Sequence, residues 1–447
     1  MPDLAAIARR VAGWARDGEQ VEAYVAWSSD TSVRVYSGDV ESLSSAESEG
    51  LGVRVVSGGR QGFAYAGSLD DRVLEETLAE ARDNAGFATP DEAVGLALPD
   101  GVEPAPMDLW RDELAELPTE RKVTMALDLE RRVREGDPRI RQVESANYGD
   151  GMGEAAVATS TGVFAHHRRT GCFLSVWAIA AEGDDTQTGG GYSVGRSPSE
   201  LDLEEAASDA VERATRLLGA KKPRSSRLPV VFDRRVTSSL LGVLSGTFSG
   251  EAVLKGRSLF ADRLGETVAA PLVTLVDDPT DPAAYGATPF DAEGLATRRN
   301  PLIEGGVLGR FLYDTYAARR AGTSSTASAV RAGFKSGPGV GCRALSLAPG
   351  DEDAAAIMAR VGDGLLVQSV TGLHSGVNPV SGDFSVGAEG LMIRGGQLAE
   401  PVREATIAST LQRILLDVLA VGSDLEWLPG LAAGVTLAVD GLSLSGT

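Results

Sequence analysis

The sequence predicts an α+β protein with two domains, of which residues 1–222 form an N-terminal α+β domain and residues 223–447 a C-terminal, mostly-β, barrel-like domain. In the first half, stretches of alternating polarity predict antiparallel strands, and long amphipathic stretches predict helices. In the second half, short apolar segments separated by Gly and Pro are typical of a barrel or a two-layer β domain. The polar, Pro-containing stretch 221–227 connects these two halves and marks the expected domain boundary.

Four helices are expected in the first half. Residues 1–18 place Leu4, Ile7, Val11 and Trp14 at helical spacing, and the ranges 70–85 and 119–135 repeat the pattern. A fourth helix begins at Ser197 as N-cap, with Pro198 and Glu200 completing a capping box, and ends at Gly219.

Strands account for most of the remaining sequence. In the first half we expect them at 21–27, in two hairpins at 32–45 and 50–66, and at 140–148, 154–165 and 171–181, with a surface connection at 88–107 and a loop or hairpin tip at 182–191. In the second half we expect strands at 228–232, 272–276, 301–313, 364–370, 384–401 and 434–444, and helices at 234–245 and 404–421.

Charge and cysteine content exclude several classes of protein. With 42 Lys and Arg against 63 Asp and Glu, the net charge of −21 argues against a nucleic-acid partner, which needs a basic stripe. No stretch approaches 18 uncharged apolar residues, so we expect no membrane association through a span. The two cysteines form no disulfide framework and no zinc or redox spacing, which favours a cytoplasmic protein.

Side chains that could carry hydrolytic chemistry are few. The chain has three His, and adjacent His166 and His167 on one strand point to opposite faces, so they cannot grip one metal ion together. Gly191 to Gly195 matches G-x-S-x-G around Ser193, but a Thr- and Gly-rich run precedes it and no helix follows at once, as a nucleophile elbow requires. The glycine clusters 149–153 and 337–341 fit no phosphate-binding motif, and turns are the default interpretation.

The stretch 371–408 is the most informative part of the sequence: a polar, glycine-rich loop leads into the apolar hairpin 384–401, and a helix is expected after Val402. Its loop contains four side chains that could bind an extended peptide beside a strand, which we take as candidate substrate-binding residues: His374, Asn378, Ser381 and Asp383. A turn stabilised by Asn378-Pro379 and Gly382-Asp383 explains the same residues equally well. Both interpretations stay open at this point.

Several motifs resemble the TldD/PmbA family of peptidases, especially its PmbA (TldE) branch. The motifs are NPVSGDFSVGAEG from Asn378, PVREATIA from Pro401, AVGSDL from Ala420, TPFDAEG from Thr288, LIEGGVLGRFL from Leu302 and YAARRAG from Tyr316, with GLGVRV from Gly50 and GFAYA from Gly62 in the first half. The resemblance spans nearly the whole chain. It implies a heterodimer in which a TldD-type subunit binds zinc through H-E-x-x-x-H on the first helix of the C-terminal domain and a late Cys.

This chain departs from that zinc motif. The corresponding helix has Leu240, Leu241 and Ser245 where the His, Glu and second His fall, and no Cys follows Cys342. Leucine cannot ligate zinc, so no metal ligand and no catalytic residue is assigned here, and zinc is expected in the partner. The resemblance implies a noncatalytic subunit that encloses and holds unfolded or short peptides for a TldD-type partner. The alternatives are a homodimeric peptide-binding or scaffold protein and, last, an autonomous hydrolase using Ser193.

Overall fold

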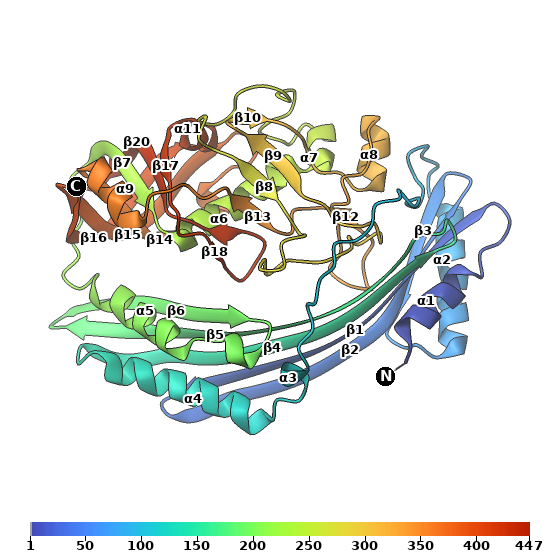
Figure 1. Cartoon of the computed structure of the whole chain (residues 1–447), viewed down its shortest axis with the longest axis horizontal. Helices are drawn as coiled ribbons and strands as arrows, with labels where there is room; N and C mark the ends of the chain where they lie inside the picture. The colour runs from blue at the N-terminus through green and yellow to red at the C-terminus, as the bar shows by residue number, and fades with distance from the viewer. Residues whose placement is uncertain (1) are drawn as a thin grey trace.

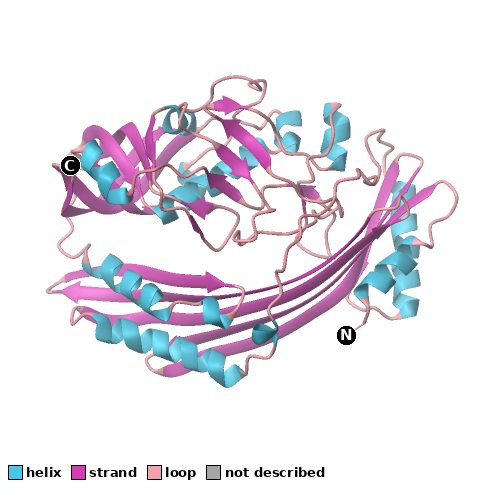
Figure 2. Cartoon of the chain, in the orientation of Figure 1, coloured by secondary structure: helices cyan, strands magenta, loops and turns pink. Residues whose placement is uncertain are grey.

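A long, curved antiparallel sheet dominates the first half of the molecule (Figures 1 and 2). The computed structural model describes residues 2–447, so Met1 of the expected first helix lies outside the described residues. The strand order is β3-β2-β1-β4-β5-β6. The strands are β1 (Glu19–Tyr36), β2 (Asp39–Ser57), β3 (Arg60–Ala66), β4 (Ile140–Thr159), β5 (Phe164–Glu182) and β6 (Asp185–Gly195).

The two faces of this sheet have different roles, because successive side chains of a strand point to opposite faces. Val21, Ala23 and Val25 of β1 lie on the convex face and are fully buried. Helices α1 (Leu4–Ala12) and α2 (Asp71–Phe87) cover one half of that face, and α4 (Thr119–Gly136) and α5 (Leu203–Thr215) cover the other. The concave face turns toward the C-terminal half (Figure 1).

The four helices expected in the first half form, but two glycine-rich segments there differ from the prediction. Residues 149–153 lie inside β4 rather than in a turn, and residues 186–191 belong to β6 rather than to a loop. Both segments pair with β5 along their whole length, so cross-strand hydrogen bonding outweighs the low strand propensity of glycine. Ser197 caps only the 3₁₀ turn Pro198–Glu200, and Asp202 caps α5 through the Glu205 N–H.

A closed β-barrel forms the core of the C-terminal half. Strands β16-β15-β14-β7-β20 follow one another, β16 also pairs with β20, and β17 extends the sheet. Their bounds are β7 (Ser226–Phe232), β14 (Gly364–Thr371), β15 (Asp383–Arg394), β16 (Gln397–Thr410), β17 (Val418–Val421) and β20 (Leu437–Ser445). Helix α6 (Arg234–Ser245) buries Val236, Leu240, Leu241 and Leu244 in the same core. The predicted α+β class with a barrel-like second half is confirmed.

Smaller elements surround the barrel. A four-stranded sheet has the order β10-β9-β8-β13, and two short hairpins complete the strands. These elements are β8 (Leu275–Asp277), β9 (Asn300–Glu304), β10 (Val307–Leu308), β11 (Ala329–Val330), β12 (Gly339–Val340), β13 (Leu345–Leu347), β18 (Glu426–Trp427) and β19 (Ala433–Gly434). The short helices are α3 (Asp112–Ala115), η1 (Pro198–Glu200), η2 (Gly246–Phe248), α7 (Gly250–Leu254), α8 (Thr315–Ala321), α9 (Ala354–Val361), α10 (Leu373–Gly376) and α11 (Leu411–Leu416).

The prediction of one helix over 404–421 is wrong. Strand β16 continues to Thr410, α11 occupies only Leu411–Leu416, and β17 follows. Ile407 and Leu411 satisfy helical spacing, but Ala405 and Ile407 are also two apart and both are buried in the barrel. Pairing of this segment with β15 on one side and with β20, which closes the barrel, on the other decides the structure.

Two features of the chain path bear on function. The connection 88–111 runs from the α2 end of the sheet to α3, near the middle of the sheet, and passes the C-terminal half (Figure 1). Leu96 in this connection accepts a hydrogen bond from Arg319 of α8 at 2.8 Å. In β2, residues 39–50 pair only with β1, because β3 pairs with residues 51–57. No helix in the described part of the chain has both the length and the apolar character needed to cross a membrane.

Candidate functional site

Two adjoining cavities lie between the concave face of the sheet and loops of the C-terminal half. Their volumes are about 440 and 480 Å³. Ser28, Gly153 and Arg169 line both of them. Because these residues come from β1, β4 and β5, the two cavities form one cleft across the middle of the sheet, which we call the central cleft.

Small residues form the floor of the central cleft. The strand register places Ser28 beside Gly153, and Gly153 beside Arg169, in one row across the sheet. In the next row Asp30 pairs with Gly151, and a Cβ at Gly151 would lie 2.8 Å from Asp30 Oδ1. Glycine therefore leaves space above the backbone that a side chain would fill.

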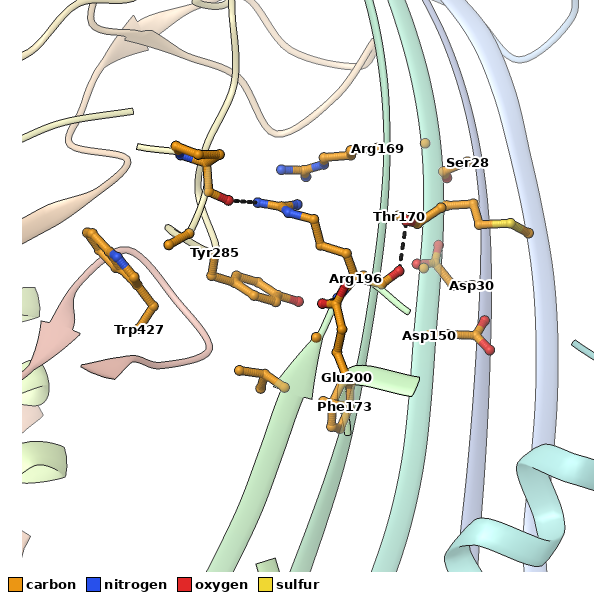
Figure 3. A pocket seen from close by; sticks show the side chains of 18 residues that line it. Ser28, Asp30, Asp150, Arg169, Thr170, Phe173, Arg196, Glu200, Tyr285 and Trp427 are labelled. Atoms are coloured by element: carbon orange, nitrogen blue, oxygen red, sulfur yellow. Dashed lines mark hydrogen bonds between the residues drawn. The ribbon is translucent and has the colours of Figure 1, made fainter. Parts of the chain in front are cut away.

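Arginine and aromatic side chains shape the 440 Å³ cavity (Figure 3). Arg196 donates to the carbonyl of Ala284 at 2.7 Å. Tyr285 and Trp427 lie on the side of the cavity away from Ser28 and Asp30. Burial lowers the pKa of Arg196, and the neighbouring charge of Arg169 lowers it further. This wall combines apolar surface with a few convergent charges, as small-ligand sites do.

Asp150 and Asp30, two acidic residues that line this cavity, lie in different surroundings. Asp150 points away from the two arginines in Figure 3 and pairs with Lys122 of α4 at 2.6 Å. Asp30 lies on the concave face, where burial and the charge of Asp150 raise its pKa. Asp30 thus faces the cavity, which Glu200 also lines, with its Oε2 accepting the Arg196 backbone N–H at 2.8 Å.

Basic side chains dominate the 480 Å³ cavity, although the whole chain carries −21 charges. The five are His167, Arg169, Arg331, Lys335 and Arg343. Burial lowers the pKa of His167 to about 4, and the charges of Arg169 and Arg343 contribute. His167 is therefore a neutral imidazole at pH 7.

A buried ionic network closes one end of this cavity. Glu22 of β1 accepts from Arg54 Nε at 2.9 Å and from Arg331 Nη2 at 2.5 Å. Arg54 also lies 3.5 Å from Glu293, which accepts from the Thr315 N–H at 2.9 Å. The network joins the sheet to loops of the C-terminal half and fixes the position of Arg331.

The four predicted substrate-binding residues lie together on one loop but outside both cavities. Asn378 Oδ1 accepts from the N–H groups of Val380 (2.9 Å) and Ser381 (3.2 Å), and Ser381 Oγ donates to Asp383 at 2.7 Å. His374 is exposed on α10. Strand β15 is no edge strand, because β14 and β16 pair with its two sides. A peptide-holding role for these residues stays a prediction, and the hydrogen bonds fit the turn interpretation.

The other candidate residues are also separated. Ser193 lies inside β6, and its hydroxyl accepts from the Asp202 N–H at 2.9 Å, so it is not exposed on an elbow. His166 contacts Glu154 at 2.8 Å, whereas His167 lines the cavity. The sequence analysis missed Arg169, although strand alternation already places His167 and Arg169 on one face.

Comparison with known proteins defines the class of the chain. The PmbA/TldA metallopeptidase domain 1 matches residues 21–85, the central domain matches 112–218 and the C-terminal domain matches 225–446. The chain therefore belongs to the PmbA/TldD metallopeptidase family.

Individual relatives cover nearly the whole chain. Metalloprotease PmbA of Escherichia coli O157:H7 is 27% identical over 98% of this chain and 94% of its own length. A crystal structure from Thermotoga maritima MSB8 has a TM-score of 0.90 at 26% identity and covers 98% of both chains. The crystal structure of TldE from Thermococcus kodakarensis has a TM-score of 0.89 at 24% identity, covering 96% of this chain and 97% of that one.

The residues on α6 do not fit the metal that the family name implies. Leu240 and Leu241 are 3% and 1% exposed and pack in the barrel core. Ser245 donates its hydroxyl to the Gly242 carbonyl at 2.7 Å, and Cys342 Sγ lies 3.8 Å from the Ser245 carbonyl. Burial and the charge of Asp277 raise the pKa of the Cys342 thiol, which disfavours a thiolate ligand. Among residues 2–447 no group of three or more His, Cys, Asp or Glu converges on one point.

Proposed function

We propose that this chain is a noncatalytic, cytoplasmic subunit of a TldD/TldE-type metallopeptidase. In this proposal it helps to enclose unfolded or short peptides and holds them for cleavage by a TldD-type partner, which carries H-E-x-x-x-H and the zinc ion. The chain itself would contribute binding and positioning of the peptide. It would contribute no metal ligand.

The observation that carries the proposal is the apolar character of α6. Leu240 and Leu241 lie where a metal-binding member of the family would present His and Glu, and both side chains are buried. Hydrolysis by a metallopeptidase requires ligands that hold the ion and leave a position for water. Aliphatic side chains supply neither, so the chemistry would have to come from another subunit.

The central cleft supports the binding part of the proposal. Its two cavities together combine a glycine-rich floor, aromatic side chains such as Tyr285 and Phe290, and several unneutralised basic groups. An extended peptide offers apolar side chains and main-chain polar groups that match such a lining. A partner subunit seated over the cleft would complete a closed chamber.

A reconstitution assay tests the proposal. Cleavage of an unfolded peptide is measured for this chain alone, for a TldD-type partner alone and for their mixture, and zinc is determined in each purified sample. We expect cleavage and stoichiometric zinc to follow the partner, and the mixture to exceed the partner alone. A partner with its first motif His replaced by Ala is the control and should abolish cleavage by the mixture.

Other results would reject the proposal. Cleavage by this chain alone, with about one zinc ion held per chain, would show an autonomous peptidase. A chain that self-associates, binds peptide and never alters the partner's activity would instead be a homodimeric peptide-binding protein.

A further inference from the structure

The charges around the 480 Å³ cavity are not balanced within the described chain. Of its two acidic lining residues, Glu154 contacts His166 at 2.8 Å. Asp291 accepts three backbone N–H bonds, from Glu293 (2.9 Å), Leu295 (3.0 Å) and Ala329 (3.1 Å). Burial and the charge of Glu293 raise the pKa of Asp291, and its three backbone N–H bonds oppose this shift.

On the basic side, only Arg331 has an ionic partner, Glu22. Arg169 and Lys335 form no ion pair with any residue of the range 2–447, and the same holds for Arg343. Arg343 donates to the carbonyl of Ala329 at 3.2 Å, but its Nε has no hydrogen-bond partner. Three cations thus surround one cavity without an ion pair in the described chain, and opposite charge reaches them at longer range, from Asp30 to Arg169 and from Asp277 and Asp291 to Arg343.

Like charge bears most on Arg343, because Arg169 and Lys335 are exposed to solvent. Burial lowers the pKa of Arg343, and the neighbouring charge of Arg169 lowers it further, as expected for like charges held close together. An anion placed between them would relieve the repulsion and accept charge-assisted hydrogen bonds from the planar guanidinium groups.

The shape of the cavity selects the kind of anion. Gly153 lies beside Arg169 in the sheet, and a Cβ there would meet only the Trp27 carbonyl oxygen, at 3.8 Å, so the space above it is open. Tyr24, Phe290 and Phe334 supply apolar surface around the basic groups. A carboxylate carried on an organic chain matches both the charges and this apolar surface.

We propose that the basic cavity formed by His167, Arg169, Lys335 and Arg343 binds a carboxylate of the peptide that the subunit holds. The inference rests on the proposed function, because it specifies which group of the peptide is recognised. The carboxylate can be the peptide's C-terminus or an Asp or Glu side chain. These sources share their chemistry, and peptide design separates them.

Calorimetry with the full-length chain tests the proposal. Three N-acetylated octapeptides of one neutral sequence are compared: one with a central Gln and an amidated C-terminus, one with a central Gln and a free C-terminus, and one with a central Glu and an amidated C-terminus. We expect at least one carboxylate peptide to bind about tenfold or more tightly than the neutral peptide, since hydrogen bonds to charged groups contribute more than neutral ones. The peptide that gains affinity identifies the source.

Matched variants locate the site. Arg169→Gln should remove the preference for the carboxylate peptide, whereas Arg168→Gln should retain it. Arg168 directly precedes Arg169 in β5 and lies on the opposite face of the sheet, with its guanidinium 4.8 Å from the ring of Trp110. Lys335→Gln provides a second, exposed site variant, so the test does not depend on replacing the more buried Arg343. Thermal unfolding of each variant confirms that it is folded.

The outcomes separate this inference from the proposed function. Equal binding of all three peptides, or an unchanged preference in both site variants, would overturn carboxylate recognition and leave peptide holding intact. No binding of any peptide would overturn both. As an independent readout, NMR titration should show the pKa of His167 rising when the carboxylate peptide is bound, because the bound anion offsets the charges of Arg169 and Arg343.

Discussion

At the scale of single residues, the buried ionic network around Glu22 joins the two halves of the chain. Burial alone would raise the pKa of Glu22, but Arg54 and Arg331 outweigh burial and lower it from 4.5 to about 2. The carboxylate is therefore needed to balance two buried guanidinium groups. Removing one partner of such a network is far more harmful than removing an exposed pair.

We predict that Glu22→Gln lowers the free energy of unfolding by about 3–5 kcal/mol at pH 7. Urea-induced unfolding measures this change. The control is Glu41→Gln, which removes the exposed pair with Arg34 and should change stability by less than about 1 kcal/mol.

The same variant gives a signed pH prediction. Because the pKa of Glu22 is lower in the folded state, its stabilising contribution is complete above about pH 4.5 and is lost as the pH falls toward 2. The stability difference between wild type and Glu22→Gln should therefore shrink as the pH is lowered from 5 to 3. A difference that stays constant would contradict the role assigned to this carboxylate.

The loop 371–383 yields a second residue-scale prediction. If Asn378 and Asp383 hold peptide, replacing either by Ala should lower the peptidase activity of the proposed heterodimer and leave the subunit folded. If they only stabilise the turn, the same substitutions should lower the melting temperature and spare activity per folded molecule. The two hydrogen bonds that Asn378 Oδ1 accepts favour the second outcome for Asn378→Ala. Measuring both quantities on both variants distinguishes the two roles.

At the scale of elements, close contact between α5 and β6 depends on glycine. A Cβ at Gly191 would overlap the carbonyl oxygen of Ala206 on α5. We predict that Gly191→Ala destabilises the protein by about 1–3 kcal/mol, because the helix must move away from the sheet. The control is Gly242→Ala within α6, where a Cβ meets nothing within 4 Å and the helix should gain up to about 1 kcal/mol. Thermal unfolding that ranks the two variants in the opposite order would refute this account.

Elements also show what the sequence could and could not predict. Helices with long apolar faces, such as α2 and α4, have the expected residues within two positions at each end. Residues 404–410 satisfy helical and strand spacing at once, and pairing with β15 and β20 decides between them. The glycine-rich residues 149–153 indicate a turn locally, and their place in a central strand depends on neighbours far away in sequence.

The candidate site follows the same division. Alternation in 164–173 already places His167 and Arg169 on one face of a strand. Arg343 comes to line the same cavity as His167 and Arg169, without an acidic ion-pair partner among residues 2–447, because the C-terminal loops fold over the concave face. No local pattern contains that information.

At the scale of the whole molecule, several contacts besides the chain joint hold the two halves together. The connection 88–111 follows the edge of β5 and contacts α8, where Tyr316 donates to Asp91 at 2.8 Å. Near the joint, Arg213 of α5 pairs with Asp233 at 2.6 Å. The proposed domain boundary at 222/223 therefore divides the sequence, but the two halves on either side of it are held together by contacts elsewhere.

We predict that the halves remain associated after cleavage at that boundary. A protease site inserted between Lys222 and Pro223, which are surface residues, allows the chain to be cut once after folding. The two fragments should elute together in size-exclusion chromatography at physiological salt, because apolar clusters and the Glu22 network cross the interface. Separate elution of the fragments would show that the joint itself maintains the arrangement.

The stretch of β2 that pairs with β1 alone affects how the protein behaves at high concentration. Residues 39–48 are exposed on both faces, and their outer backbone edge pairs with no strand of the described chain. Such an edge can template addition of a strand from another molecule, which is the first step of aggregation. Glu41, Glu47 and Glu49 place negative charges along this edge and repel an identical one approaching it. Repulsion between these acids, of which Glu41 is paired with Arg34, therefore opposes the addition of an identical strand to this six-stranded sheet.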